Sequence, residues 1–132
     1  MPKARAPEKT SPVDDLRGLA PSWVISLEAR NLSANTVATY TQSLELLADF
    51  LCENEMPTSV SGIHREHVEA WLAAMAMAQR PATVRNRYTG ARMFFRWAVE
   101  EGEIHSSPMQ NMTPPAIPEN PPDILTEAEL RR

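Results

Sequence analysis

The chain has 132 residues, enough for one domain or one small domain with tails. Its 13 lysines and arginines against 17 aspartates and glutamates give a net charge of −4, a total that by itself argues weakly against a nucleic-acid partner. The single cysteine excludes an intrachain disulfide and fits a reducing compartment. Because no apolar run approaches the roughly 20 residues of a membrane span and no secretory signal is visible, we expect a cytoplasmic protein without a membrane partner.

The first predicted element is a helix preceded by a basic tail. Residues 1–12 contain three prolines and are expected to be disordered. From about residue 13 to 30, apolar residues are spaced 4, 3 and 4 apart, as on one face of a helix. They are Leu16, Ala20, Trp23 and Leu27. Pro21 stands inside this window and could either kink a longer helix or occupy the first turn of a shorter one. We expect a short turn followed by a helix from about residue 20.

A second helix is predicted to begin after Ser33, whose hydroxyl can cap the first turn. Its apolar stripe consists of Val37, Tyr40, Leu44, Leu47 and Leu51. Cys52, next to the end of this stripe, is expected to be packed. The other side carries hydroxyl and amide groups in the first half, among them Asn35 and Thr39, and carboxylates only in the second half. A neutral half is unusual for a helix surface that only has to be soluble.

Two more helices are predicted after a short loop. The third runs from about residue 64 to 79, with inward-facing Val68, Trp71, Leu72 and Met75. The fourth runs from about residue 82 to 101 and ends at a capping glycine, Gly102. Its expected buried residues are Val84, Tyr88, Ala91, Phe95 and Ala98. Four amphipathic helices with short connections and no alternating strand pattern predict an all-α four-helix bundle over residues 13–105.

A proline-rich segment follows the predicted bundle. Residues 106–123 hold six prolines in eighteen positions, a composition typical of a semi-rigid linker. Residues 124–132 then begin another helix, with Thr126 as its cap and Glu129 three residues later, as in a capping box. Because the chain ends within about two turns of this start, we expect this chain to be the front end of something longer.

Five arginines occur between residues 70 and 99 without any carboxylate, so the rest of the chain carries a net charge of −9, five units below the total of −4. On the fourth helix a stripe with spacings of 4, 3 and 4 is formed by Arg85, Thr89, Arg92 and Arg96, flanked by Arg80 and Arg87. A solvated helix face is one interpretation, but such faces usually place an acid four residues from a base, and these arginines lack such partners. Arginine also favours bidentate contacts to phosphate or guanine. The stripe therefore predicts a DNA-binding surface, and the alternative is a helical protein-interaction module with a basic docking face.

No other group of residues indicates chemistry. His64 and His67 could share a helix face, but two ligands without a third do not make a zinc site, and we expect no metal there. The sequence shows no Ser/His/Asp set and no glycine-rich phosphate loop, so we assign no cofactor and no catalytic residue.

In chain order, the distinctive segments read "LSANTVATYTQSLELLADFL", "HVEAWLAAM", "TVRNRYTGARMFFRWAVEEGEI", a proline-rich stretch and "LTEAEL". In this order of segments the chain resembles the N-terminal SAM-like core-binding domain of tyrosine recombinases of the phage-integrase type. The positions that carry the resemblance are Ser33, Thr36, Tyr40, Thr83, Arg92, Phe94, Phe95, Trp97, Gly102, Ile104 and Pro108. His64 departs from the family pattern, in which Ser, Thr or Asp usually caps the third helix.

The resemblance implies a function for the chain. In such enzymes a core-binding domain and a larger catalytic domain clamp one half-site of the recombination core, and other recombinase protomers join them in a synaptic complex. The second and fourth helices lie against the DNA, whereas the catalytic residues all belong to the catalytic domain, of which residues 124–132 would be the truncated start. We therefore expect this chain to bind double-stranded DNA without being an enzyme by itself. The residues expected at the DNA are Asn35, Thr36, Thr39, Arg80, Thr83, Arg85, Arg87, Thr89, Arg92 and Arg96.

Overall fold

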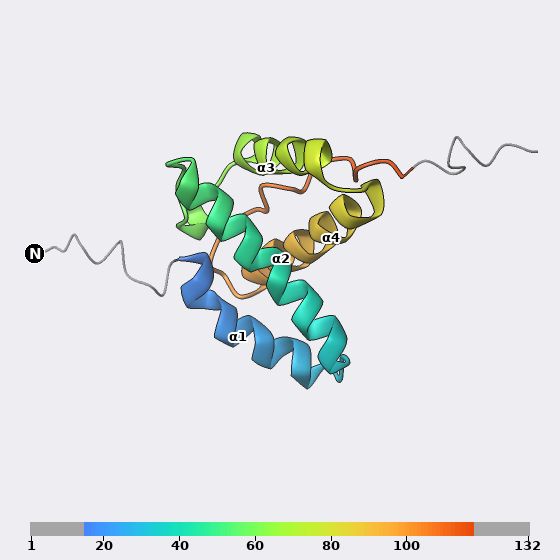
Figure 1. Ribbon diagram of the computed structural model, residues 1–132. Coiled ribbons are helices and arrows are strands. Elements are labelled where there is room, and N and C mark those ends of the chain that lie inside the picture. Colours follow the sequence, from blue (N-terminus) through green and yellow to red (C-terminus); the bar gives the residue numbers. More distant parts are fainter. Residues whose placement is uncertain (1–14, 118–132) are drawn as a thin grey trace, which may run out of the picture.

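The computed structural model describes residues 15–117, and within this range the chain forms four α-helices and one short 3-10 helix (Figure 1). They are α1 (Leu16–Ala29), α2 (Ala34–Glu53), η3 (Val60–Gly62), α3 (Arg65–Ala78) and α4 (Pro81–Glu100). The all-α prediction is confirmed for this part of the chain, in which an isolated bridge between Asp15 and Ser59 is the one β-type contact. None of these helices is long and apolar enough to cross a membrane. The tail predicted at 1–12 and the helix start predicted at 124–132 lie outside the described residues.

α1 begins about one turn earlier than the sequence predicted. It starts at Leu16, so Pro21 lies inside the helix. The carboxylate of Asp15 caps the first turn by accepting a hydrogen bond from the amide of Arg17 at 3.0 Å. The amide of Leu16 donates to the carbonyl of Thr58 at 3.1 Å, and the Leu16 side chain is fully buried. These contacts offset the backbone hydrogen bond that Pro21 cannot donate, which is why the helix extends across the proline.

The other three α-helices follow their local signals. Ser33 is the N-cap of α2, as predicted, and its Oγ accepts a hydrogen bond from the amide of Thr36 at 3.1 Å. α3 and α4 begin and end within one residue of their predicted bounds. Gly102 follows α4 with a φ of +81°, a left-handed conformation that glycine adopts without strain.

The hydrophobic core lies between the helices and contains every residue predicted to be buried on α4. The ring of Trp23 from α1 packs edge-on against Phe94 from α4, with centroids 5.3 Å apart. The predicted core positions that are only partly buried are Ala20, Val37, Tyr40 and Met75. The prediction that Cys52 is packed is wrong, because this residue lies about 100° round α2 from the buried Leu51 and is exposed.

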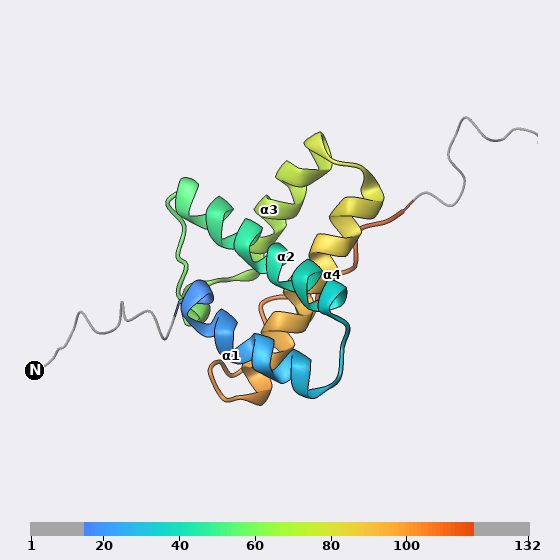
Figure 2. The same ribbon diagram turned by 60° about the horizontal axis from the view of Figure 1, so that its bottom comes forward.

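α2 and α4 cross near their midpoints and form the most extensive contact between helices in the described range (Figures 1 and 2). At the crossing, Gly90 of α4 lies against Ser43 of α2, which is fully buried. A Cβ atom at position 90 would stand 2.5 Å from Ser43 Oγ and 2.6 Å from Ser43 Cβ, so the close approach of the helices requires glycine. Beyond the crossing, the N-terminal halves of α2 and α4 diverge on the same side of the molecule.

After α4 the chain turns back along the bundle instead of leaving it. The segment 103–115, which we call the strap, runs towards the N-terminal end of α4 (Figures 1 and 2). Met109, near its middle, belongs to the hydrophobic core. The described part of the proline-rich segment therefore packs on the bundle.

Candidate nucleic-acid interface

The arginines of α4 lie on two different faces of the helix. Gly90 marks the side that faces α2, and with about 100° of rotation per residue, Thr83 and Arg87 lie within about 60° of it. The stripe predicted from the sequence lies about 100–160° away from Gly90 and consists of Arg85, Thr89, Arg92 and Arg96. Arg80 precedes the helix as its N-cap residue and is exposed. We call Thr83 and Arg87 the α2-facing group and the other set the outer stripe.

The polar residues predicted on α2 lie in its first half, on the side that faces α4. The helical period places Thr36, Thr39 and Asn35 within about 80° of Ser43, the contact point with α4. Thr36 Oγ1 accepts a hydrogen bond from Ser33 Oγ at 2.9 Å, and Thr39 Oγ1 donates to the carbonyl of Asn35 at 2.9 Å. By this geometry the three residues and the α2-facing group point towards the space between the diverging halves of the two helices.

The two helix starts that flank this space carry no negative charge. The first turns of α2 and α4 contain no acidic residue. Unpaired amides give a helix N-terminus a partial positive charge, which favours a phosphate group. The space between α2 and α4 therefore has the electrostatic character of an anion site.

The carboxylates in the second half of α2 are directed elsewhere. Glu45 and Asp49 lie about 160° and 120° round the helix from Ser43, and both contact Arg17 of α1. Arg17 Nε donates to Glu45 Oε1 at 2.9 Å. This hydrogen bond, with the attraction of both carboxylates, raises the pKa of the Arg17 guanidinium against the opposing effect of its partial burial. The acidic surface of α2 is thus neutralised in part by α1, away from α4.

The outer stripe has more internal partners than the sequence predicted. The expectation that its arginines lack acidic partners is wrong for Arg96, whose Nε lies 3.9 Å from an oxygen of Glu100, one turn further along the helix. Arg85 donates from Nη1 to the carbonyl of Pro115 in the strap at 3.2 Å. Arg92 is exposed and has no ion pair within residues 15–117.

A cleft of about 380 Å³ separates the second half of the outer stripe from the strap. Its polar lining includes, besides the carboxylate of Glu100 that lies near Arg96, side chains that can donate: Arg92 and Arg96 from α4 and His105, Ser107 and Gln110 from the strap. Guanidinium, imidazole, hydroxyl and amide groups can all donate hydrogen bonds to a phosphate. Sequence reasoning missed the three strap residues because they follow the helix without any periodic pattern, and only their position beside the arginines identifies them.

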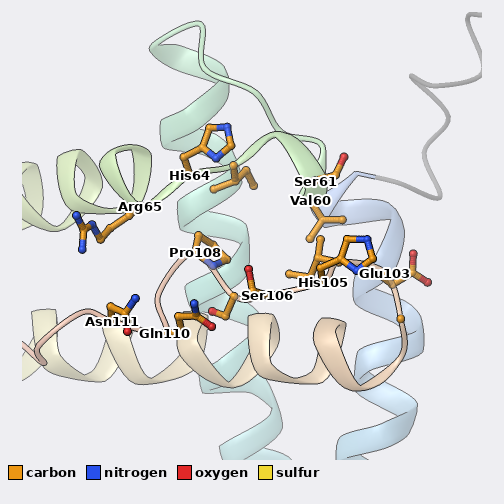
Figure 3. Close-up of a pocket in the computed structure, with 14 residues that line it drawn as sticks. Val60, Ser61, His64, Arg65, Glu103, His105, Ser106, Pro108, Gln110 and Asn111 are labelled. Atoms are coloured by element: carbon orange, nitrogen blue, oxygen red, sulfur yellow. The ribbon is translucent and has the colours of Figure 1, made fainter.

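A larger cleft, of about 680 Å³, lies on the other side of the strap (Figure 3). His64 and Arg65 from the start of α3 line one side of it, and Pro108 and Asn111 from the strap line the other. Arg65 and Glu103 both lie in its lining, and Arg65 is also within 3.8 Å of Glu69, so this cleft lacks the excess of arginine over carboxylate that the cleft beside the outer stripe has.

The histidine pair at the start of α3 has a structural role. His67 Nδ1 accepts a hydrogen bond from the backbone amide of His64 at 2.9 Å, as the third residue of a capping box does. The described residues contain no group of three or more His, Cys, Asp or Glu side chains that could hold a metal ion. The departure from the family pattern at His64 is therefore compensated by the side chain of His67.

Comparison with known proteins identifies related sequences. Residues 22–102, more than half of the chain, match the family described as phage integrase, N-terminal SAM-like domain. The chain is 27% identical over 117 residues to tyrosine recombinase XerC of Chlorobaculum tepidum, a match that covers 83% of this chain and 35% of that protein. It is 28% identical over 121 residues to tyrosine recombinase XerD of Corynebacterium glutamicum, covering 86% of this chain and 40% of that protein.

A third relative is tyrosine recombinase XerC of Neisseria meningitidis serogroup C, 30% identical over 106 residues, which are 76% of this chain and 34% of that protein. The chain thus spans two fifths or less of the length of these relatives. No solved structure gives a significant match to the chain.

Proposed function

Because the chain belongs to the phage integrase N-terminal SAM-like domain family, we propose that it is the core-binding, DNA-binding part of a tyrosine recombinase. Duplex DNA lies across the diverging N-terminal halves of α2 and α4. The observation that carries this proposal is the crossing at Gly90 and Ser43, which directs two acid-free helix starts and Arg87 towards one space. Positive groups gathered in this way attract phosphates by releasing counterions.

The division of the α4 arginines between two faces suits a helix that enters the major groove. An α-helix with its side chains is about 10–12 Å across, and the major groove is about 12 Å wide, so a helix within it has a phosphate backbone on each flank. The α2-facing group meets one backbone together with Asn35, Thr36 and Thr39 of α2. Thr89, Arg92 and Arg96 of the outer stripe meet the other, where the cleft beside the strap receives a phosphate. Such contacts set the register on the duplex more than they read its sequence.

The remaining surface fits a clamp that has a second half. The acids Glu45 and Asp49 lie away from α4 and keep non-specific binding low. We assign no catalytic residue to this chain. Cleavage and strand transfer belong to a catalytic domain in a longer protein, which acts with other recombinase protomers bound at the same recombination core.

Fluorescence anisotropy with a labelled duplex at low salt tests this function. Replacing Arg87 or Arg92 by alanine should weaken binding about threefold to tenfold, since each change removes one phosphate contact. The matched control is Arg65→Ala, which removes the same charge from α3, where the arginine is exposed and lies 3.8 Å from Glu69. The control should bind within about twofold of the parent.

Two results would count against the proposal. If all three variants bind equally well, α4 does not contact the DNA. If duplex DNA fails to bind at low salt, while an acidic protein binds and depends on Arg87 and Arg92, the basic face is a protein-docking surface instead.

A further inference from the structure

The strap is joined to the bundle by apolar side chains and by two side-chain hydrogen bonds, and its Ile104 and Met112 pack against the core while partly buried. Near its middle, Met109 inserts into the core and is 1% exposed. Further along, Tyr88 Oη on α4 donates to the carbonyl of Met112 at 3.4 Å. At the end, Arg85 Nη1 donates to the carbonyl of Pro115 at 3.2 Å. The anchors follow one another towards the N-terminal end of α4, so they hold the strap in one direction (Figure 1).

Open clefts border the strap between these anchors. The 680 Å³ cleft separates it from the start of α3, as Figure 3 shows, and the 380 Å³ cleft separates it from the end of α4. A third cleft of about 480 Å³ lies beside Thr113 and Pro115, between the strap and the facing residues of α3. Beyond Met112, the last strap residue that packs against the core, the hydrogen bond from Arg85 to Pro115 is the one described hydrogen bond that joins the strap to the bundle, so its loss should free the end of the strap.

Arg85 differs from the other arginines of α4 because its guanidinium donates a hydrogen bond to a backbone carbonyl of the strap. Its guanidinium is partly buried and is directed to a strap carbonyl, whereas Arg92 is exposed. A hydrogen bond from a charged group is stronger than one between neutral groups. Pro115 is close to the last described residue, Ile117, so this bond holds the chain near the point where it leaves the described bundle.

We propose that Arg85 is a positioning residue that fixes the exit of the chain beside the N-terminal end of α4. The consequence rests on the proposed function. If α4 enters the DNA groove, a fixed exit directs whatever follows the strap along the same duplex. A restricted exit also raises the effective concentration of a second DNA-binding part compared with a freely moving linker. Arg85 thus serves the clamp through the strap rather than as a phosphate contact.

The distance between two spin labels tests the proposal without any DNA. One label occupies Cys52, the single natural cysteine, which is exposed, and the other occupies the variant Ile117→Cys. In the parent chain we expect a narrow distance distribution. In Arg85→Met, which keeps the side-chain stem but removes the donor, the released population should rise about tenfold. Five freed residues, 113–117, would spread the label over about 12 Å.

Two controls make the measurement decisive. Arg92→Met removes the same charge from the outer stripe at an arginine that makes no hydrogen bond to the described part of the strap, and it should leave the distribution narrow. Tyr88→Phe removes the other hydrogen bond and should add to the effect of Arg85→Met in the double variant. A distribution that stays narrow in Arg85→Met, or that broadens equally in Arg92→Met, overturns the proposal. Either result leaves the DNA-binding test with Arg87→Ala unaffected, so the two proposals can fail separately.

Discussion

Single side chains at helix ends connect the local sequence to the packing of this domain. Asp15 caps α1, and the next residue but one, Arg17, joins α1 to α2 through Glu45 and Asp49. A helix start that local propensity does not favour, with Pro21 inside it, is therefore held by a cap and a cross-helix ion pair together. The position of α1 depends on side chains far apart in the sequence.

Replacing Arg17 by methionine should destabilise the fold by about 0.5 kcal/mol or less, because the side chain is 42% exposed and water screens the ion pair. The pKa of Arg17 is raised in the folded protein, chiefly by the hydrogen bond from its guanidinium to Glu45. A raised pKa contributes stability that is fully present below the unfolded-state value and is lost only as pH rises through the folded one. The effect of the substitution should therefore be the same from neutral to mildly alkaline pH and should shrink as salt is added.

Urea unfolding at low and high salt measures this difference. Arg65→Met is the matched control, since Arg65 is also an exposed arginine with an acid within 4 Å but on a single helix. A loss of stability in Arg17→Met that does not change with salt would mean that the attraction between the Arg17 charge and the two carboxylates does not join the helices.

At the scale of elements, one small contact sets how α2 and α4 cross. Gly90 and Ser43 bring the two helix axes together, and the rest of the α2 and α4 surfaces diverge from that point. Both helices have local signals for their bounds, but the angle between them comes from this contact. Since the proposed DNA surface lies between their diverging halves, the crossing and the function are directly linked.

Gly90→Ala should destabilise the domain by about 1–3 kcal/mol, because the new methyl group overlaps Ser43 Oγ and Cβ and forces the helices apart. It should also weaken DNA binding, because the two contact surfaces then no longer match one duplex. Thermal unfolding and anisotropy on the same variant measure both effects. The double variant Gly90→Ala with Ser43→Gly removes the overlapping atoms and should restore part of the DNA affinity.

Gly102→Ala is a matched control for this prediction. It places a methyl group on a residue with a φ of +81° and should cost about 1 kcal/mol or more. The added Cβ atom would have no atom within 4 Å apart from its neighbours in the chain, and the position lies outside the crossing. The control should lose stability and keep its DNA affinity. If it weakens DNA binding as much as Gly90→Ala at equal stability, general destabilisation rather than helix separation explains both variants.

At the scale of the whole molecule, opposite charges are segregated despite the net charge of −4. The outer side of α2 carries acids that contact α1, whereas α4 carries five arginines around its length and at its cap. Arg85 and Arg96 have partners in the strap and in Glu100. Three arginines, Arg80, Arg87 and Arg92, therefore have no ion pair within residues 15–117.

If these three arginines each neutralise one phosphate, while the charge of Arg96 stays balanced by Glu100, the logarithm of the DNA association constant should fall with the logarithm of salt concentration with a slope of about −3. Arg87→Ala should reduce that slope by about one unit. Anisotropy titrations over a series of salt concentrations give both values. A slope near zero would show that charge does not drive the association, and a slope near −5 would show that Arg85 and Arg96 exchange their internal partners for DNA.

Much of the fold could be predicted from the sequence, and the reasons are local. Ser33 and Gly102 mark helix ends by their own chemistry, and the 3 and 4 spacing on α4 identifies its buried side without reference to any other helix. The start of α1 could not be predicted, because it depends on Thr58, more than forty residues away. The capping role of His67 was hidden because histidine is an uncommon residue at that position.

The sequence by itself determined the all-α class, the start of α2, the bounds of α3 and α4 and the concentration of arginines on α4, since caps, period and charge are properties of neighbouring residues. Only the tertiary structure decided which arginines share a side with α2, which one is bound to the strap and which line a cleft. The physical reason is that a helical period fixes angles within one helix, whereas the contact of Gly90 with Ser43 and the return of the strap relate that helix to the rest of the molecule.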